Sequence, residues 1–170
     1  MPRIHVCPLN KIAETARLTG ARSMITLINA GTAVTRPDAI DPSRHLHVSI
    51  SDIVTEVDGH VLAHDNHVGT LIDFVSRWDR VDPLLIHCWA GVSRSTAAAF
   101  ISVCALHPVR SELEVARALR AASPTATPNA RLVALADEQL GRNGRMVAAI
   151  SSIGRGADCF EGVPFALDVG

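Results

Sequence analysis

The chain has 170 residues, 48% of them hydrophobic, which is enough for one domain with a substantial core and too few for two full domains. Its formal net charge of -1 excludes the basic surface that binding to nucleic acid or an anionic membrane requires. The sequence has no signal-type apolar segment and no apolar run long enough to cross a bilayer, and its four scattered cysteines do not suggest a secreted disulfide framework. We therefore expect a cytoplasmic protein that binds neither nucleic acid nor membrane.

The chain opens with alternating strand and helix patterns. Residues 4–9 and the apolar run 24–29 predict two buried strands. Between them, residues 11–18 predict a helix that ends at Gly20 and has Asn10 as its N-cap.

The next strand and helix follow a proline-bearing loop. Residues 45–50 alternate in hydrophobicity as a half-buried strand does, and Asp52 follows them closely. Residues 67–78 place apolar side chains at helical spacing, with Asn66 as the expected N-cap.

A short apolar stretch, 84–86, is expected as the central strand, and a helix is expected from Ser95 onward. The alternation of strands and helices predicts an α/β fold with a central, mostly parallel sheet flanked by helices. Residues 87–95 would then connect the central strand to the beginning of a helix.

Two further helices are predicted downstream. Ser111, with a glutamate three residues later, has the form of a capping box for a helix reaching residue 122, and residues 130–140 predict another helix that ends at Gly141. We expect residues 1–141 to form the main domain. Residues 142–170, with one weak helical patch, are expected to be a loosely packed tail on that domain.

The most informative segment, residues 87–95, reads His-Cys-Trp-Ala-Gly-Val-Ser-Arg-Ser. Free N–H groups at a helix N-terminus attract a tetrahedral anion, and Gly91 allows the loop to curl tightly. Helix N-termini and nearby cations also favour the thiolate form of cysteine, so Cys88 is expected to react as a nucleophile. Arg94 offers a planar fork that holds two oxygens of a phosphoryl group.

These residues match the signature His-Cys-x5-Arg-Ser/Thr at every position, and the segment resembles that of the cysteine-dependent protein tyrosine phosphatases. The order of predicted elements over residues 4–140, with the pair Pro128-Asn129, is similar to the dual-specificity-like and bacterial branch. The resemblance implies a protein tyrosine phosphatase-like fold and hydrolysis through a phosphocysteine, and it implies no cofactor and no metal. The Trp-Pro-Asp motif of the tyrosine-specific enzymes is absent.

The resemblance also implies a role for each signature residue. Cys88 would attack phosphorus, Ser95 would hydrogen-bond to its sulfur, and His87 would order the loop. Arg94 would hold phosphate oxygens together with the backbone of the loop residues, which are Trp89, Ala90, Gly91, Val92 and Ser93.

An acid is also needed, because the leaving group of a phosphate ester must be protonated. Asp52 is the first choice, since it follows a strand at the sheet edge where α/β folds bind ligands, and its distance in sequence before Cys88 is similar to the family's. Asp58 and Asp65 are the alternatives.

Three other features have competing interpretations. A cluster of histidines and an aspartate could hold zinc, but its spacing gives no closed ligand set, and it is expected at the rim or in solvent; its members are His60, His64, Asp65 and His67. Cys104 is expected in the core. Asn129 could fix the loop below the site or cap the following helix.

The leading hypothesis is a phosphatase that acts on phosphorylated proteins or small phosphate esters. The neutral side chains of Trp89, Ala90 and Val92 make polyphosphorylated lipids a less suitable substrate. The alternatives are arsenate reduction, which would need a second cysteine nearby, sulfur transfer, and a phosphate-binding module without turnover.

Overall fold

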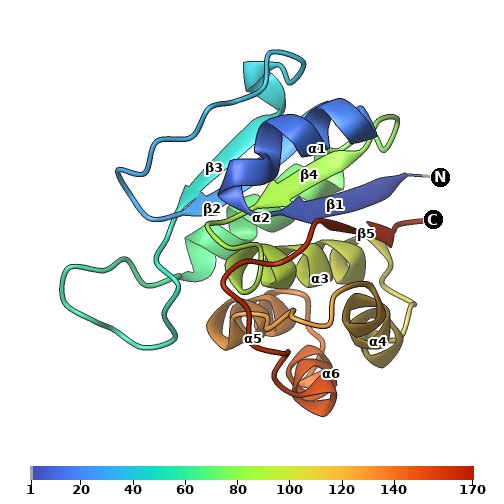
Figure 1. The fold of residues 1–170 in the computed structure, drawn as a ribbon. Helices are drawn as coiled ribbons and strands as arrows, with labels where there is room; N and C mark the ends of the chain where they lie inside the picture. Colours follow the sequence, from blue (N-terminus) through green and yellow to red (C-terminus); the bar gives the residue numbers. More distant parts are fainter. Residues whose placement is uncertain (1) are drawn as a thin grey trace.

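A five-stranded sheet runs through the centre of the computed structural model, which describes residues 2–170 (Figure 1). Its strands are β1 (Arg3–Cys7), β2 (Ser23–Ile28), β3 (His45–Ser49), β4 (Leu84–His87) and β5 (Phe165–Asp168). They lie in the order β3-β2-β4-β1-β5. All neighbours are parallel except β5, which is antiparallel to β1. This confirms the mostly parallel α/β fold and the central position of β4.

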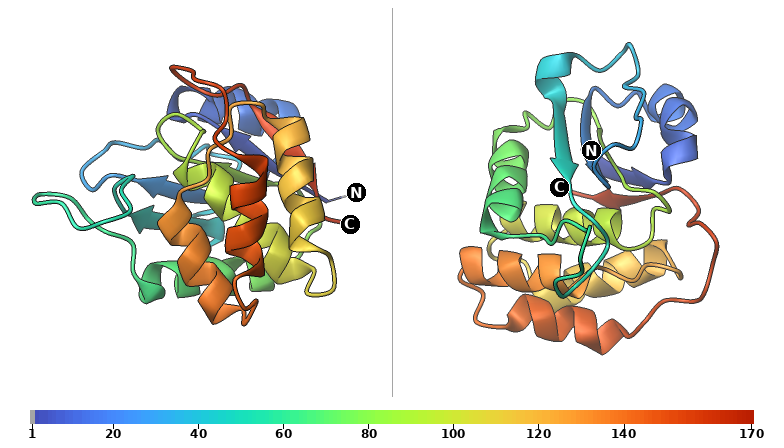
Figure 2. Two further views of the ribbon diagram at one scale, coloured as in Figure 1. Left: turned by 90° about the horizontal axis from the view of Figure 1, so that it is seen from below. Right: turned by 90° about the vertical axis from the view of Figure 1, so that its left-hand side faces the viewer.

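Helices cover both faces of the sheet (Figures 1 and 2). They are α1 (Ile12–Thr19), α2 (Asp65–Arg77), α3 (Arg94–Leu106), α4 (Glu112–Ala122), α5 (Ala130–Gln139) and α6 (Arg145–Ile153), with 3-10 turns at Leu9–Lys11 and Pro42–Arg44. Helix α1 lies on one face, α2 and α3 lie on the other, and α4, α5 and α6 form a further layer beyond α3. Every residue of β2 and β4 is buried, as expected for parallel strands covered on both faces.

Each face of the sheet has its own cluster of buried apolar side chains. Met24 and Leu85 pack with α1, whereas their chain neighbours Ile25 and Ile86 belong to the larger cluster on the opposite face. This follows from the strand geometry, in which successive side chains point to opposite faces.

Helix α3 is the central helix of the larger layer, and all of its residues except Ala105 are buried. Small side chains at positions 97–99 let its backbone pack closely against the sheet. The start of α3 is therefore held firmly beside the end of β4. Within residues 2–170, neither α3 nor any other helix combines the length and apolar character needed to span a membrane.

Two of the expected helix caps are wrong, and a third is in place without its hydrogen bond. Asn10 lies in a 3-10 turn and directs its amide to Glu161, so Lys11 occupies the N-cap of α1. Helix α2 is capped by His64, whose backbone N–H donates to the ring of His67 at 2.9 Å, rather than by Asn66. Ser111 is the N-cap of α4, and the helix reaches residue 122 as expected, but the serine side chain makes no capping hydrogen bond.

The expectation of a loosely packed tail is also wrong. In α6, Met146 and Ala149 are buried in the main core. Asp137 of α5 accepts hydrogen bonds from the backbone N–H of Gly144 and Met146, each at 2.7 Å, and this fixes the start of α6. Strand β5 then extends the sheet beside β1. The part of the chain with only a weak helical pattern therefore forms part of the core.

Candidate active site

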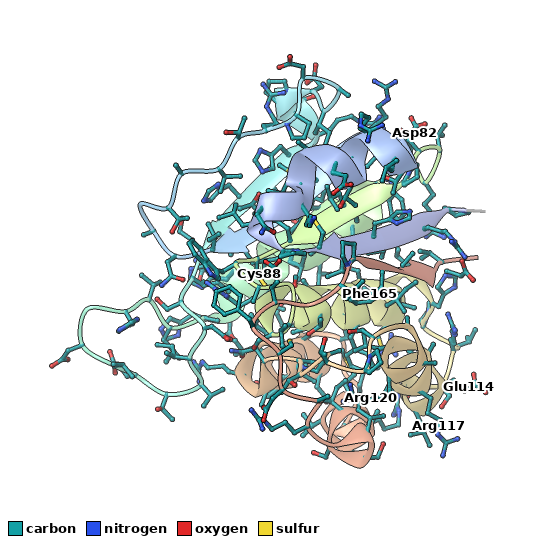
Figure 3. The ribbon with its side chains drawn as sticks, in the orientation of Figure 1. Asp82, Cys88, Glu114, Arg117, Arg120 and Phe165 are labelled. Carbon is teal, nitrogen blue, oxygen red and sulfur yellow. The ribbon has the colours of Figure 1, made fainter. Side chains whose placement is uncertain are left out.

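The loop between β4 and α3 lies at the carboxyl edge of the sheet, where Figure 3 shows Cys88. Gly91 turns this loop with φ at +69°, a conformation that side chains disfavour. A Cβ on Gly91 would also lie 2.9 Å from the carbonyl carbon of Cys7 and from the nitrogen of Pro8. Only glycine fits here, because the loop packs directly onto the backbone at the end of β1.

The carbonyl groups of the loop are held from outside by four N–H groups from three segments of the chain. Their donors are backbone N–H groups: Leu9 to Trp89 at 3.0 Å, Gly162 to Ala90 at 2.8 Å, Thr127 to Val92 at 2.9 Å, and Asn129 to Ser93 at 3.1 Å. Among residues 2–170, none of the loop's own N–H groups from Trp89 to Ser93 has an acceptor. The loop therefore offers a set of unpaired donors of the kind that binds an anion.

Arg94 begins α3 and is 6% exposed. Its Nη1 donates to Oδ1 of Asn29 at 2.6 Å and to the carbonyl of Ile50 at 2.9 Å, which fixes the guanidinium plane. Its Nε is buried and has no hydrogen-bond partner within residues 2–170. A buried donor without a partner is costly, so the free Nε edge is best explained by a ligand with paired oxygens.

Cys88 and Ser95 face each other across the base of the loop. The distance from Cys88 Sγ to Ser95 Oγ is 3.1 Å, and both residues are buried. The serine hydroxyl can donate a hydrogen bond to a thiolate, which stabilises the charged sulfur.

His87 is fully buried, and its ring is fixed at both nitrogens. Nδ1 lies 3.0 Å from the carbonyl of Cys88 and must donate to it, while Nε2 lies 2.8 Å from Thr26 Oγ1. Burial lowers the pKa of His87 to about 4, so the ring is neutral and Nε2 accepts from the Thr26 hydroxyl. Thr26 in turn accepts from Nε2 of His45 at 2.8 Å. A neutral, ordered chain of hydrogen bonds thus supports the backbone at Cys88.

Asp52 also lines the pocket and is in direct contact with the loop. Its Oδ1 accepts from Ser93 Oγ at 2.6 Å and from Asn129 Nδ2 at 2.9 Å. Its Oδ2 accepts no hydrogen bond from the residues described, so this is the oxygen available to hold a proton. Asn129 also accepts from the N–H of Leu132 at 3.1 Å, and both of its expected roles are therefore present.

These groups surround one pocket of about 310 Å³, lined by Asn29, Asp52, Cys88, Trp89, Ala90, Val92, Ser93, Arg94 and Cys159. The rival acids are not among the lining residues: Asp58 is exposed in a loop, and Asp65 begins α2. His64 and His67, which were considered as zinc ligands, instead interact at the start of α2, and residues 2–170 contain no group of three side chains that could hold a metal ion. Cys104 lies in the core as expected.

Three residues that lie at the site were not predicted from the sequence. Asn29 directly follows β2, so the rule that places ligands at the carboxyl edge of parallel strands could have found it. Thr26 points to His87 from a neighbouring strand, which requires knowing the register. Cys159 reaches the pocket from the tail, and no pattern in the sequence signals this.

Neither family models nor curated proteins match the sequence. Solved structures do match its fold. The Cydia pomonella PTP-2 phosphatase has a TM-score of 0.63 at 19% identity, over 79% of this chain and 84% of that one. Human DUSP28 has a TM-score of 0.62 at 14% identity, over 82% and 89%. A human tyrosine phosphatase-like serine/threonine/tyrosine-interacting protein has a TM-score of 0.63 at 16% identity, over 82% and 92%.

The chain therefore has the fold of these phosphatase and phosphatase-like structures. Its neighbours include dual-specificity phosphatases, as the resemblance of residues 87–95 led us to expect.

Proposed function

We propose that the protein is a cysteine-dependent phosphatase that hydrolyses phosphate monoesters through a phosphocysteine. One observation carries this proposal: a cysteine lies at the base of a loop whose N–H groups from Trp89 to Ser93 find no acceptor within residues 2–170, beside an arginine whose buried Nε has no partner among those residues either. Such an arrangement is costly unless an oxyanion with several oxygens occupies it. A phosphoryl group satisfies these donors and places phosphorus next to Cys88.

In the first step, the Cys88 sulfur attacks phosphorus and the bond to the ester oxygen breaks. The loop N–H groups and the free edge of Arg94 hold the equatorial oxygens, whose charge they stabilise in the transition state. Asp52 donates a proton from Oδ2 to the departing oxygen while Ser93 and Asn129 keep Oδ1 in place.

In the second step, water attacks the phosphocysteine. Asp52, now a carboxylate, accepts a proton from that water, since the acid of the first step becomes the base of the second. Cys88 leaves as a thiolate, and the Ser95 hydroxyl, 3.1 Å from its sulfur, donates a hydrogen bond to the departing charge.

The proposed substrates are phosphorylated proteins or small esters with a single phosphate. Among the described residues that line the pocket, Arg94 is the only basic one, and Trp89 stands half-exposed at its rim. A second phosphate on the substrate would meet Asp52 without a compensating cation. An aromatic ring at the rim instead suits an aryl ester such as phosphotyrosine.

The first test is hydrolysis of p-nitrophenyl phosphate as a function of pH, with chelator and reductant present. Wild type should turn over, and Cys88→Ser should not, because an alcohol ionises far less readily than a thiol. Cys104→Ala, which changes a buried thiol outside the pocket, is the matched control and should retain activity. Phosphate binding without turnover in the wild type would instead indicate a binding module.

A second candidate is arsenate reduction, and the position of Cys159 favours it. Reduction of arsenate to arsenite takes two electrons, which two thiols in one pocket can supply by forming a disulfide. Arsenate reduction would be supported if wild type produces arsenite faster than it releases phosphate. The production of arsenite should then be lost in Cys159→Ser. Thiosulfate turnover above both would indicate sulfur transfer.

A further inference from the structure

Strand β5 forms one edge of the sheet, with α1 on one side of it and α4 on the other (Figure 1). Just after β5, the N–H of Val169 donates to the carbonyl of Pro2 at 3.2 Å. Hydrogen-bonded pairs alternate along an antiparallel ladder, so every second residue back from Val169 also bonds to β1. The N–H and C=O groups of Ala166 and Asp168 therefore point to the outer side of β5. Within residues 2–170, no strand or loop pairs with these groups.

A cavity of about 460 Å³ lies beside this edge, on the face of the sheet that α1 covers. His5 of β1 and Ala166 of β5, which lie opposite each other in the sheet, form its base. Leu18 of α1, which is 68% exposed, and Pro164 give it apolar walls. A cavity of this size and composition accepts a large apolar side chain, because binding removes apolar surface from water.

A smaller cavity of about 150 Å³ lies on the opposite face of the same strand, between β5 and α4. Val115 of α4 lines it together with Ala166 and Asp168. Arg110 also lines this cavity and is partly buried, and its guanidinium has no hydrogen bond or ion pair within residues 2–170. The carboxylate of Asp168 does not neutralise it, because that carboxylate is paired with Arg3 at 2.7 Å. The smaller cavity is therefore suited to an acidic side chain.

The two cavities lie where the side chains of an added strand would point. Successive side chains of a strand point to opposite faces of a sheet, so neighbouring residues of an added strand would face one cavity each. The main chain of that strand would meet the free groups of Ala166 and Asp168. Sheet edges that bind extended peptides combine these two features, an open edge and side-chain cavities on alternate faces.

We propose that the outer edge of β5 binds an extended segment of a partner protein in which apolar and acidic residues alternate. The segment adds to the five-stranded sheet; its apolar side chains enter the cavity beside α1, and an acidic side chain pairs with Arg110. Because β5 has only four residues, main-chain hydrogen bonds are few, and the cavities determine most of the affinity and the preferred sequence. No residue that lines the pocket around Cys88 takes part, so the inference does not rest on the proposed function.

A second copy of this chain fits the edge less well than such a segment. Antiparallel pairing of two β5 strands would place Ala166 and Asp168 of the second copy on the α1 face, where the cavity is apolar. On the other face the second copy would offer only Phe165 and Leu167, which pack in its own core and carry no charge for Arg110. A partner segment satisfies both cavities, whereas a second copy satisfies neither.

The test is titration of the protein into a fluorescein-labelled peptide, Thr-Glu-Leu-Glu-Leu-Glu-Leu-Thr, monitored by fluorescence anisotropy. Wild type should bind it at least about tenfold more tightly than a peptide of the same composition in which the glutamates and the leucines form separate blocks. Amide hydrogen exchange, measured by NMR, reports where the peptide binds. The amides of Ala166 and Asp168 should exchange readily in the free protein and become protected when the peptide is bound.

Two variants change the cavities separately. Arg110→Glu should weaken binding about tenfold or more, and it should instead favour the same peptide with lysines in place of the glutamates. Leu18→Ser, which removes apolar surface from the larger cavity, should also weaken binding. Arg117→Glu is the matched control, because it makes the same charge reversal at an exposed position on α4 outside the cavity, and it should leave binding unchanged (Figure 3). Each of these positions reaches solvent, so the variants should fold.

Equal affinity for the alternating and the block peptides would overturn the inference, as would binding that leaves the amides of Ala166 and Asp168 unprotected. Absence of binding at peptide concentrations on the order of 1 mM would do the same. Protection of these amides that rises with protein concentration alone would show that a second copy occupies the edge instead. Because turnover is not measured, none of these outcomes bears on the proposed function.

Discussion

Replacing Asp52 with asparagine isolates the proton that we assign to its Oδ2. Asparagine has nearly the same shape, and its amide oxygen can still accept from Ser93 and Asn129, now 2.6 and 2.9 Å from Oδ1. Its NH2 group would occupy the place of Oδ2 but cannot deliver a proton to a leaving group. The variant should therefore keep its fold and phosphate affinity while losing only acid catalysis, worth about 100- to 10,000-fold, or about 3 to 5 kcal/mol in the barrier.

The assay compares two substrates with different leaving groups. Phenol has a pKa of about 10, as the tyrosine side chain does, and needs a proton as it leaves, whereas p-nitrophenol leaves readily without one. Asp52→Asn should slow phenyl phosphate by the full factor and p-nitrophenyl phosphate far less. Asp58→Asn, which changes a carboxylate outside the pocket, is the control and should slow neither. Equal slowing of both substrates by Asp52→Asn would refute the assignment.

Further outcomes follow from other contacts. Arg94→Lys keeps the charge but loses the planar fork, and kcat/KM should fall about 100- to 1,000-fold with p-nitrophenyl phosphate. Gly162→Ala puts a Cβ 2.9 Å from the Gly91 oxygen and should lower kcat about tenfold or more, whereas Gly69→Ala, whose Cβ would be 3.5 Å from its nearest neighbour, should not. Because the pKa of His87 is lowered to about 4 in the folded protein, the unfolded chain takes up a proton on this ring at a higher pH than the folded protein does. The free energy of unfolding, measured in urea, should therefore fall as the pH drops from about 6.5 towards 4. The fall should be less steep in His87→Asn. Glu112→Gln leaves the buried Arg142 without its ionic partner at 2.9 Å and should cost about 3 kcal/mol in the same measurement.

Features that depend on residues close together in sequence could be predicted from the sequence, whereas features that depend on contacts between distant residues could not. The loop at the end of β4 could be predicted because residues 87–95 are contiguous, and their chemistry depends mainly on a strand followed by a helix. Asp52 could be nominated because it follows a strand at the correct edge. Thr26 could not, because its hydroxyl reaches His87 only through the pairing of β2 with β4.

The errors in the tail have the same origin. Residues 142–170 contain several glycines and only a weak helical pattern, which locally favours irregular structure. Their order comes instead from partners far away in sequence, such as β1 for β5 and Ala90 for Gly162. The caps failed for a related reason, since His64 and His67 satisfy the start of α2 with ring nitrogens, which composition rules do not anticipate.

The pairing of β5 with β1 bears on the order in which the protein acquires its site. Arg3 lies opposite Asp168, so the first and last strands meet only when nearly the whole chain is available. Gly162 lies shortly before β5, so its contact with Ala90 also belongs to this late stage. Contacts so distant in sequence are slow to form because closing long loops costs entropy. A nascent or refolding chain should therefore build the four parallel strands and α3 first and gain a complete pocket only in its final folding event.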